Sequence, residues 1–443
     1  MINIIAKSFS GKYGTDSNVG DIIHLQLTVS SVERNTNNKE IILVTDVSGS
    51  METSMKEVKS STLAFRDSLV GKKPTEMELL TPSDRDDLFR NTIDTRLITF
   101  SNEANEVWSP ASDNMFEEVV VGLKSEALTN MGDALKLAFD KVDRSKFGWI
   151  IAMTDGESNR GCCRTHGSFQ RLVTTTKPIN TKIVTLGYGD KFDPEVLNAV
   201  GTFAYVEDSE TIPIVLGNLA EEILSAVGFN CVVDLQGANL VDELTDDTLI
   251  NPDAPKTTKI IAGNRVVGPL CGGKTYDILY LPHGNIQSSD KLSKFETVTV
   301  RYTDIQTGAE VVREVNIEHT SEEPAEYHRG LYYESEKKRM VYSLYQKIQT
   351  KSHDLSKVVK QIENVIEGWN EDIALEHKEE LLKMIQDTKK NGHEHLSYNA
   401  SAFLNRAVGS GYTNYDDGYD RGYARATIHS TQYYMASPLI NNK

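Results

Sequence analysis

The fold is decided by one stretch of the chain, Ile41-Ile42-Leu43-Val44-Thr45-Asp46-Val47-Ser48-Gly49-Ser50. Its uninterrupted apolar run is typical of a strand that is covered on both faces, as in a mostly parallel sheet. A helical pattern follows, in which apolar or small residues recur at spacings of three and four: Met55, Val58, Thr62, Phe65 and Leu69. The stretch therefore predicts a buried strand that ends at Asp46 and leads into a helix.

Similar short apolar runs recur further along the chain, with helical patterns between them. They are Leu97–Phe100, Trp149–Met153, Ile183–Leu186 and Phe203–Val206. This alternation predicts an α/β doubly wound fold with a mostly parallel sheet. A last helix is expected from Ile212 to Val227, and it closes a domain that we place at residues 39–228.

The regions on either side of this domain have strand-like patterns. Ile23-His24-Leu25-Gln26-Leu27-Thr28-Val29 alternates between apolar and polar residues, which predicts one half-buried strand. Further strands are expected at 231–235, 259–261, 276–281 and 295–302. Because a lone N-terminal strand is not stable by itself, we expect residues 1–38 to join residues 229–320 in a small β-sandwich. The α/β domain would then be inserted between the two parts of that sandwich.

The C-terminal part is expected to be helical, with an irregular tail. Amphipathic patterns over residues 321–406 predict a helical hairpin or small bundle whose apolar stripes form a core. They involve Met340, Leu344, Ile348, Leu355, Val359, Ile362, Ile366, Trp369, Leu381 and Ile385. The segment 407–443 is rich in Gly, Tyr and Asp, and we expect no regular structure there.

Composition limits the classes of partner. The chain has 443 residues, and its 47 Lys and Arg against 64 Asp and Glu give a net charge of -17. Such a surface repels nucleic-acid backbones and anionic lipid, so we expect neither as a partner.

The location is predicted from three further features. The sequence has no run of about 18 apolar residues, so we expect no membrane span, and the N-terminal apolar stretch is too short for a secretory signal. Four cysteines do not make a disulfide framework, which favours a cytoplasmic, reducing location.

Five oxygen-bearing side chains are predicted to meet at one edge of the sheet. Asp46, Ser48 and Ser50 follow the first strand, Asp155 follows the strand Trp149–Met153, and Thr129 precedes a helix. Ligands of open α/β sheets bind at the carboxyl ends of strands. Two carboxylates and three hydroxyls suit a hard cation, Mg²⁺ first and Mn²⁺ or Ca²⁺ as alternatives. In a simpler interpretation, Asp46 and Ser48 only cap the next helix, but this leaves the other residues unexplained.

These residues resemble the metal-ion-dependent adhesion site (MIDAS) of von Willebrand factor type A domains. In that family a D-x-S-x-S loop, a Thr and a later Asp hold the metal, and the resemblance assigns these roles to the five residues above. Pro82-Ser83-Asp84-Arg85, Ile98–Asn102 and Thr129–Leu135 also resemble the family, while residues 86–95 look like an insertion. The resemblance implies that a carboxylate of a protein partner completes the metal's coordination shell.

The flanking regions resemble proteins that pair this domain with a "Vwaint" region, some of which are RING-type ubiquitin ligases. Ligase activity is not implied here, because four scattered cysteines cannot build a RING. The sequence therefore favours a non-enzymatic, Mg²⁺-dependent protein-interaction module. Two alternatives stay open: a substrate-binding subunit linked to a ubiquitin-ligase-type pathway, and a structural component of a large assembly in which the metal is architectural.

Two weaker signals are set aside. Gly268-Pro269-Leu270-Cys271-Gly272-Gly273-Lys274-Thr275 satisfies the P-loop pattern, but a strand rather than the required helix is expected after it. We interpret this segment as a β-hairpin. Cys162 and Cys163, with His166 nearby, have poor spacing for chelating one metal and are expected in a surface loop. No nucleophile motif or acid–base pair stands out, so we expect no enzyme activity.

Overall fold

A computed structural model describes most of the chain up to residue 386. The described residues are 2–12, 19–33, 35–71, 76–77, 79–126, 128–188, 192–206, 212–235, 264–280, 296–320, 333, 337, 340, 355–369, 372, 374–375 and 377–386.

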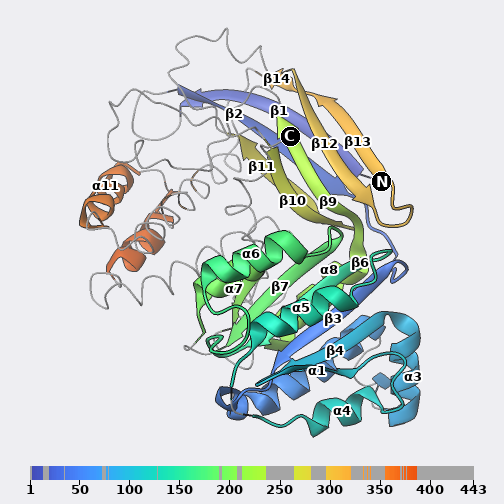
Figure 1. The fold of residues 1–443 in the computed structure, drawn as a ribbon. Helices are drawn as coiled ribbons and strands as arrows, with labels where there is room; N and C mark the ends of the chain where they lie inside the picture. The colour runs from blue at the N-terminus through green and yellow to red at the C-terminus, as the bar shows by residue number, and fades with distance from the viewer. Residues whose placement is uncertain are drawn as a thin grey trace.

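A six-stranded sheet forms the centre of the N-terminal half (Figure 1), in the order β5-β4-β3-β6-β7-β8. Five strands are parallel, and the edge strand β5 runs antiparallel to β4. Their bounds are β3 Lys39–Asp46, β4 Asp94–Phe100, β5 Ala104–Trp108, β6 Phe147–Thr154, β7 Thr181–Tyr188 and β8 Thr202–Val206. Every residue of β3, β6 and β7 is buried, as the uninterrupted apolar runs predict.

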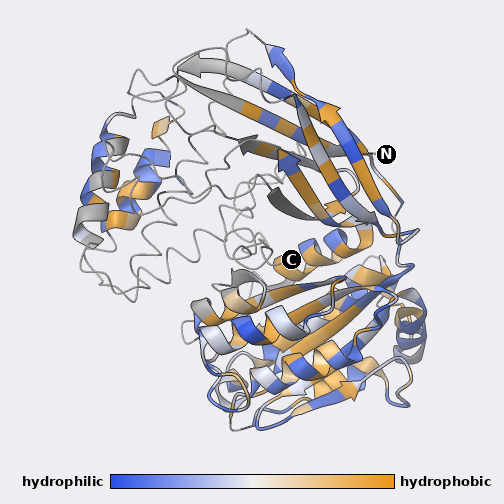
Figure 2. Ribbon diagram, turned by 45° about the horizontal axis from the view of Figure 1, so that its top comes forward, coloured by the Kyte–Doolittle hydropathy of each residue, from blue (hydrophilic) through white to orange (hydrophobic). Residues whose placement is uncertain are grey.

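Helices cover both faces of this sheet. One face packs against α1 (Met55–Val70), α3 (Pro82–Thr92), α4 (Phe116–Gly122) and α8 (Ile212–Ser225). The other packs against α5 (Met131–Lys141), α6 (His166–Thr176) and α7 (Pro194–Val200). Hydrophobic residues concentrate on the strands between these two layers (Figure 2). The mixed α/β fold predicted from the sequence is confirmed.

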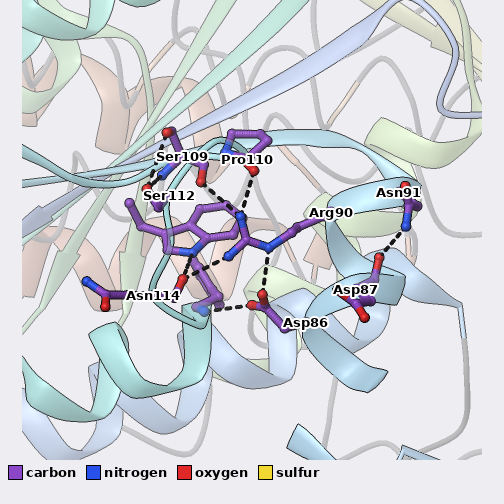
Figure 3. Close-up of polar contacts among 10 residues, drawn as sticks. Asp86, Asp87, Arg90, Asn91, Ser109, Pro110, Ser112 and Asn114 are labelled. Carbon is purple, nitrogen blue, oxygen red and sulfur yellow. Dashed lines mark hydrogen bonds and ion pairs between the residues drawn. The ribbon is translucent and has the colours of Figure 1, made fainter. Parts of the chain in front are cut away.

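The segment 86–95, expected as an insertion, is mostly the second half of α3, and hydrogen bonds connect it to the rest of the domain (Figure 3). The Arg90 guanidinium lies 4.9 Å over the Trp108 ring. It donates hydrogen bonds to the Asp86 carboxylate at 2.6 Å and to the carbonyls of Pro110 at 2.6 Å and Asn114 at 2.8 Å. One arginine thus joins the helix to the loop after β5.

Two further sheets, of four strands each, lie beside the α/β part (Figure 1). One has the order β11-β2-β1-β14 and the other β10-β9-β12-β13. Their bounds are β1 Ile2–Lys12, β2 Val19–Val29, β9 Ala226–Leu235, β10 Asn264–Cys271, β11 Thr275–Tyr280, β12 Thr297–Asp304, β13 Glu310–Asn316 and β14 Glu318–Thr320. Buried side chains from both sheets make one hydrophobic core, so the start of the chain packs with residues beyond 226.

The expectation of a single N-terminal strand is wrong, because β1 precedes β2 and pairs with it over 11 residues. Within residues 2–8 the burial alternates along β1, but the apolar Ile5 is 40% exposed and the polar Ser8 is buried, so the sequence itself does not alternate clearly. The helix expected to reach Val227 ends at Ser225, and β9 begins at the next residue. The predicted strand 259–261 lies outside the described residues.

The α/β domain packs directly against strand β9 of the neighbouring four-stranded sheet. Phe229 of β9 lies against Phe147 and Trp149 of β6, with ring centroids 5.4 and 5.3 Å apart. The buried Lys39 amine donates to the carbonyls of Asn35 at 2.6 Å and Ile223 at 2.7 Å. Helix α8 therefore passes directly into a strand whose core is continuous with that of the α/β domain.

The described C-terminal residues include α11 (Leu355–Glu367) and helical residues at 377–386. Ile362, Ile366 and Trp369 are buried, and the Trp369 ring lies 5.1 Å from that of Tyr333. The helical hairpin stays a prediction, and the tail 407–443 lies outside the described residues. Among the residues that the structure describes, no helix is long and apolar enough to cross a membrane.

Candidate metal centre

Asp46 ends β3 as a buried carboxylate with 0% exposure. One oxygen accepts a hydrogen bond from the Ser48 amide at 2.7 Å, and the other accepts one from the Thr154 hydroxyl. Burial raises the pKa of Asp46 to about 6; the hydrogen bonds from Thr154 and Ser48 oppose this rise, and the nearby Asp155 adds to it. Among the described residues, Asp46 forms no salt bridge with a lysine or arginine.

Ser48 and Ser50 lie on the loop that follows Asp46. Ser48 is 1% exposed, Ser50 is exposed, and their hydroxyl oxygens are 3.0 Å apart. Ser48 precedes the short 3-10 helix Gly49–Glu52, but its side chain makes no capping bond, and α1 begins after Ser54. The interpretation in which Ser48 only caps a helix is therefore wrong.

Thr129 is held in place through its backbone. Its carbonyl accepts hydrogen bonds from the amides of Asn159 at 3.0 Å and Arg160 at 3.1 Å, and its own amide donates to Asn159 Oδ1 at 3.0 Å. The next residue, Asn130, caps α5 by accepting a bond from the Asp133 amide at 3.3 Å. Thr129 is therefore fixed between the start of a helix and the loop that follows Asp155.

The three segments meet beside Gly156, the residue after Asp155. A Cβ atom added to Gly156 would lie 3.1 Å from Ser50 Oγ and 3.8 Å from Thr129 Oγ1. The glycine thus leaves a small space bordered by hydroxyls from two segments, next to the buried Asp155 of the third. Two carboxylates and three hydroxyls are a donor set that fits a hard divalent cation with some water ligands. No group of three or more His, Cys, Asp or Glu suited to a metal occurs in the described residues.

A family model for the von Willebrand factor type A domain matches residues 40–214. This is the segment whose sheet and helices are described above. The chain contains a von Willebrand factor type A domain. Such domains are generally protein-interaction modules rather than enzymes.

Several solved structures are similar to the chain at low sequence identity. A von Willebrand factor type A protein from Catenulispora acidiphila is 17% identical, with a TM-score of 0.52, and the match covers 88% of this chain and 89% of that chain. The ArnB paralog VWA2 from Sulfolobus acidocaldarius is 15% identical over 90% and 99% of the two chains, with a TM-score of 0.49.

A third structure is proximal thread matrix protein 1 from the mussel byssus, with a zinc-occupied MIDAS motif. It is 19% identical, covers 46% of this chain and 51% of that chain, and has a TM-score of 0.34. No curated protein matches the chain.

Several residues of the domain that support the site were missed from the sequence. They are Thr154, which bonds Asp46; Asn159 and Asn130, which fix Thr129; and Gly156 and Gly161. Gly161 has φ +87°, and a Cβ there would lie 1.7 Å from Asn130 Oδ1. The sequence offered two signals for them. A glycine next to Asp155 is typical of a turn, and an asparagine three residues before Asp133 is typical of a helix cap.

The structure also shows where the P-loop-like segment and the cysteine pair lie. Lys274 lies in the turn between β10 and β11, and a strand follows it, so the P-loop context is absent. The two strands are not a hairpin, however, because β10 pairs with β9 and β11 pairs with β2 in the other sheet. Cys162 is exposed but Cys163 is buried, and all four cysteines are free thiols.

Proposed function

We propose that the von Willebrand factor type A domain holds one Mg²⁺ ion at Asp46, Ser48, Ser50, Thr129 and Asp155, as a complete MIDAS. The observation that carries this proposal is the meeting of Ser50 and Thr129 at Gly156, beside two buried carboxylates. A divalent ion supplies positive charge to Asp46, which has no salt bridge within the described residues. Mn²⁺ or Ca²⁺ has the same preference for oxygen ligands and is the alternative occupant.

The function we propose is metal-dependent, non-enzymatic binding of a protein partner. The exposed Ser50 puts the ion within reach of the surface, where a carboxylate of the partner replaces a water ligand.

We also propose that residues 1–38 and 229–320 form one β-sandwich of the Vwaint type around the inserted domain 39–228. The core shared by the two four-stranded sheets supports this arrangement. A cytoplasmic location stays a prediction, and the four free thiols agree with it.

The proposal is tested by capture of partners from a cell extract, with Mg²⁺ or with a chelator. The wild type should retain a few proteins only with Mg²⁺, while Asp46→Ala and Thr129→Ala retain none. Thr174→Ala is the matched control, because Thr174 is an exposed threonine on α6 that bonds only its own helix. Circular dichroism checks that each variant is folded. Equal capture with and without chelator would contradict the proposal.

The same experiment separates the two alternatives. Co-sedimentation in one large, stable particle that survives the chelator would favour a structural role with an architectural metal. Capture of ubiquitin-ligase components together with their substrates would favour the adaptor role.

A further inference from the structure

Two neighbouring cysteines lie in the loop between β6 and α6, close to the candidate metal centre. The sulfur atoms of Cys162 and Cys163 are 3.4 Å apart, in contact but not bonded. Cys162 is exposed, whereas Cys163 is 5% exposed, so a reagent in solution reaches the pair through Cys162. Because a disulfide bond is about 2.05 Å long, a small local movement brings the two sulfurs to bonding distance.

The same loop holds Thr129 in place. The backbone amides of Asn159 and Arg160 donate to the Thr129 carbonyl, and Asn159 Oδ1 accepts a hydrogen bond from the Thr129 amide. The Ser158 hydroxyl donates to the Cys163 carbonyl at 3.1 Å. The cysteine pair is therefore bonded to the residue before Asn159, and a change of backbone at the pair reaches the residues that position Thr129.

The start of α5 leaves the pair no room on one side. A Cβ atom on Gly132 would lie 2.9 Å from both the Cβ and the amide nitrogen of Cys163, and 3.0 Å from the sulfur of Cys162. The pair thus packs directly against the helix backbone. Because the helix blocks that direction, closing of the pair has to displace residues 158–161, which lie between the cysteines and the loop end at the metal centre.

The chemistry of a vicinal pair favours a reversible bond. Neighbouring Cα atoms are about 3.8 Å apart across a trans peptide, below the usual spacing of about 4.4–6.8 Å in disulfides. The ring is therefore strained, and strained disulfides are the easily reduced, regulatory kind. Partial burial of its sulfur, with Cys163 and Asp133 beside it, raises the pKa of Cys162, although Lys136 opposes the rise. Cys162 is therefore protonated near pH 7, and the pair closes slowly.

We propose that Cys162 and Cys163 are a redox modification site, which a small-molecule disulfide closes into a vicinal disulfide that lowers Mg²⁺ affinity at Thr129. The Cys162 thiolate attacks the small-molecule disulfide, breaks its S–S bond and releases one thiol. The Cys163 sulfur then displaces the second. One S–S bond forms in the protein, and the two protons of the protein thiols leave with the two small thiols. The effect on Mg²⁺ rests on the proposed function, whereas formation of the bond does not.

The test treats the full chain with oxidised glutathione and follows one peptide by mass spectrometry. Trypsin cleaves after Arg160 and Arg164, and the peptide Gly161–Arg164 contains both cysteines of the pair and no other. It should become two hydrogen atoms lighter, and dithiothreitol should restore its mass. In calorimetry of the same samples, Mg²⁺ affinity should fall about tenfold on closure and recover on reduction, since residues that orient metal ligands typically contribute about 10–100-fold.

Hydrogen exchange supplies a readout that needs no metal. The amides of Asn159 and Arg160 are protected by the Thr129 carbonyl in the reduced chain. When the loop is displaced, these hydrogen bonds are lost, so the segment Glu157–Arg160 should exchange about tenfold faster or more in the closed form.

Two variants control the experiment. Cys162→Ser removes the exposed thiol and keeps the other three, so it should bind Mg²⁺ like the reduced wild type and show no response to oxidised glutathione. Gly167→Ala is the matched control: Gly167 lies in α6, four residues after Cys163, with open space around it. It keeps both thiols and should respond like the wild type.

Three results would overturn the proposal. One is a Gly161–Arg164 peptide that stays a dithiol or carries a glutathione adduct in place of the disulfide. Another is closure that changes neither Mg²⁺ affinity nor hydrogen exchange, and the third is a full response in Cys162→Ser. If the reduced wild type binds no Mg²⁺, the proposed function fails, and peptide mass and hydrogen exchange alone decide the modification site. Faster exchange on closure then supports it, and unchanged exchange overturns it.

Discussion

The two ends of β3 carry buried carboxylates in different surroundings. At the carboxyl end, Asp46 accepts hydrogen bonds from a hydroxyl and an amide, lies near a second acid, and forms no salt bridge within the described residues. At the other end, Glu40 has two acids near it but also Lys146, which neutralises one of them. The position of each carboxylate in the sheet therefore decides which charged groups surround it.

The cause is the topology of a parallel sheet. Loops leave the carboxyl ends of the strands and bring Ser48, Ser50 and Thr129 towards Asp46 from separate segments. At the other end, Glu40 follows the junction residue Lys39 and is covered by the tight turn that contains Asp143 and Lys146. Among the described residues, the loops that carry Ser48, Ser50 and Thr129 lie at the carboxyl end, and Ser50 is exposed there.

The largest effect is expected from Gly161→Ala. The new Cβ would lie 1.7 Å from Asn130 Oδ1 in a backbone with φ +87°, so either this loop or the Asn130 cap next to Thr129 must move. We expect a loss of about 2–4 kcal/mol of stability and a fall in Mg²⁺ affinity of about 100-fold. Chemical denaturation and calorimetry measure the two quantities. Gly167→Ala should change neither, and an unchanged Mg²⁺ affinity in Gly161→Ala would show that this loop does not position the ligands.

Asp46→Asn and Glu40→Gln compare the two ends directly. Each variant removes a buried charge, so both should be more stable than the wild type near pH 7 when a chelator is present. For Asp46 the gain should be about 3 kcal/mol, from a shift of about two pKa units. Only Asp46→Asn should lose Mg²⁺ binding. If Glu40→Gln also lost it, the two ends would be coupled and the comparison would fail.

Mg²⁺ affinity should also depend on pH at the carboxyl end. Because Asp46 has a pKa of about 6 in the folded chain, the ion must displace a proton below that pH. We expect the apparent dissociation constant to fall about tenfold between pH 5 and pH 7. In the metal-free chain the folded state binds this proton more tightly than the unfolded state. Stability should therefore fall as the pH rises from about 4 to 6, and titrations that show no change with pH would contradict the account.

The smallest effect on stability is expected from Ser48→Ala. The Ser48 side chain makes no capping bond, so the metal-free protein should change by less than about 0.5 kcal/mol. Its Mg²⁺ affinity should still fall about tenfold, because a ligand hydroxyl is lost. A loss of about 1 kcal/mol with normal metal binding would restore the capping interpretation.

The sequence predicts the central sheet well because its strands are buried on both faces and read as apolar runs. It also identifies the five candidate ligands, since Asp46 and Asp155 directly follow such runs. It misses β1, in which the apolar Ile5 is exposed and the polar Ser8 is buried, and it misses the crossing of the chain between two sheets at Lys274. Thr154, Asn159 and Gly161 act through contacts that exist only after the loops are packed, so no local pattern marks them.

The central claim is that five side chains from three segments hold one divalent ion. Crystals grown with Mn²⁺, whose anomalous signal locates it, test this most directly. We expect one strong peak between Asp46 and Gly156, from an ion bound directly or through water by Asp46, Ser48, Ser50, Thr129 and Asp155. The peak should be absent in Thr129→Ala crystals. A wild-type crystal with no peak at this edge of the sheet, or with its peak elsewhere on the domain, would contradict it.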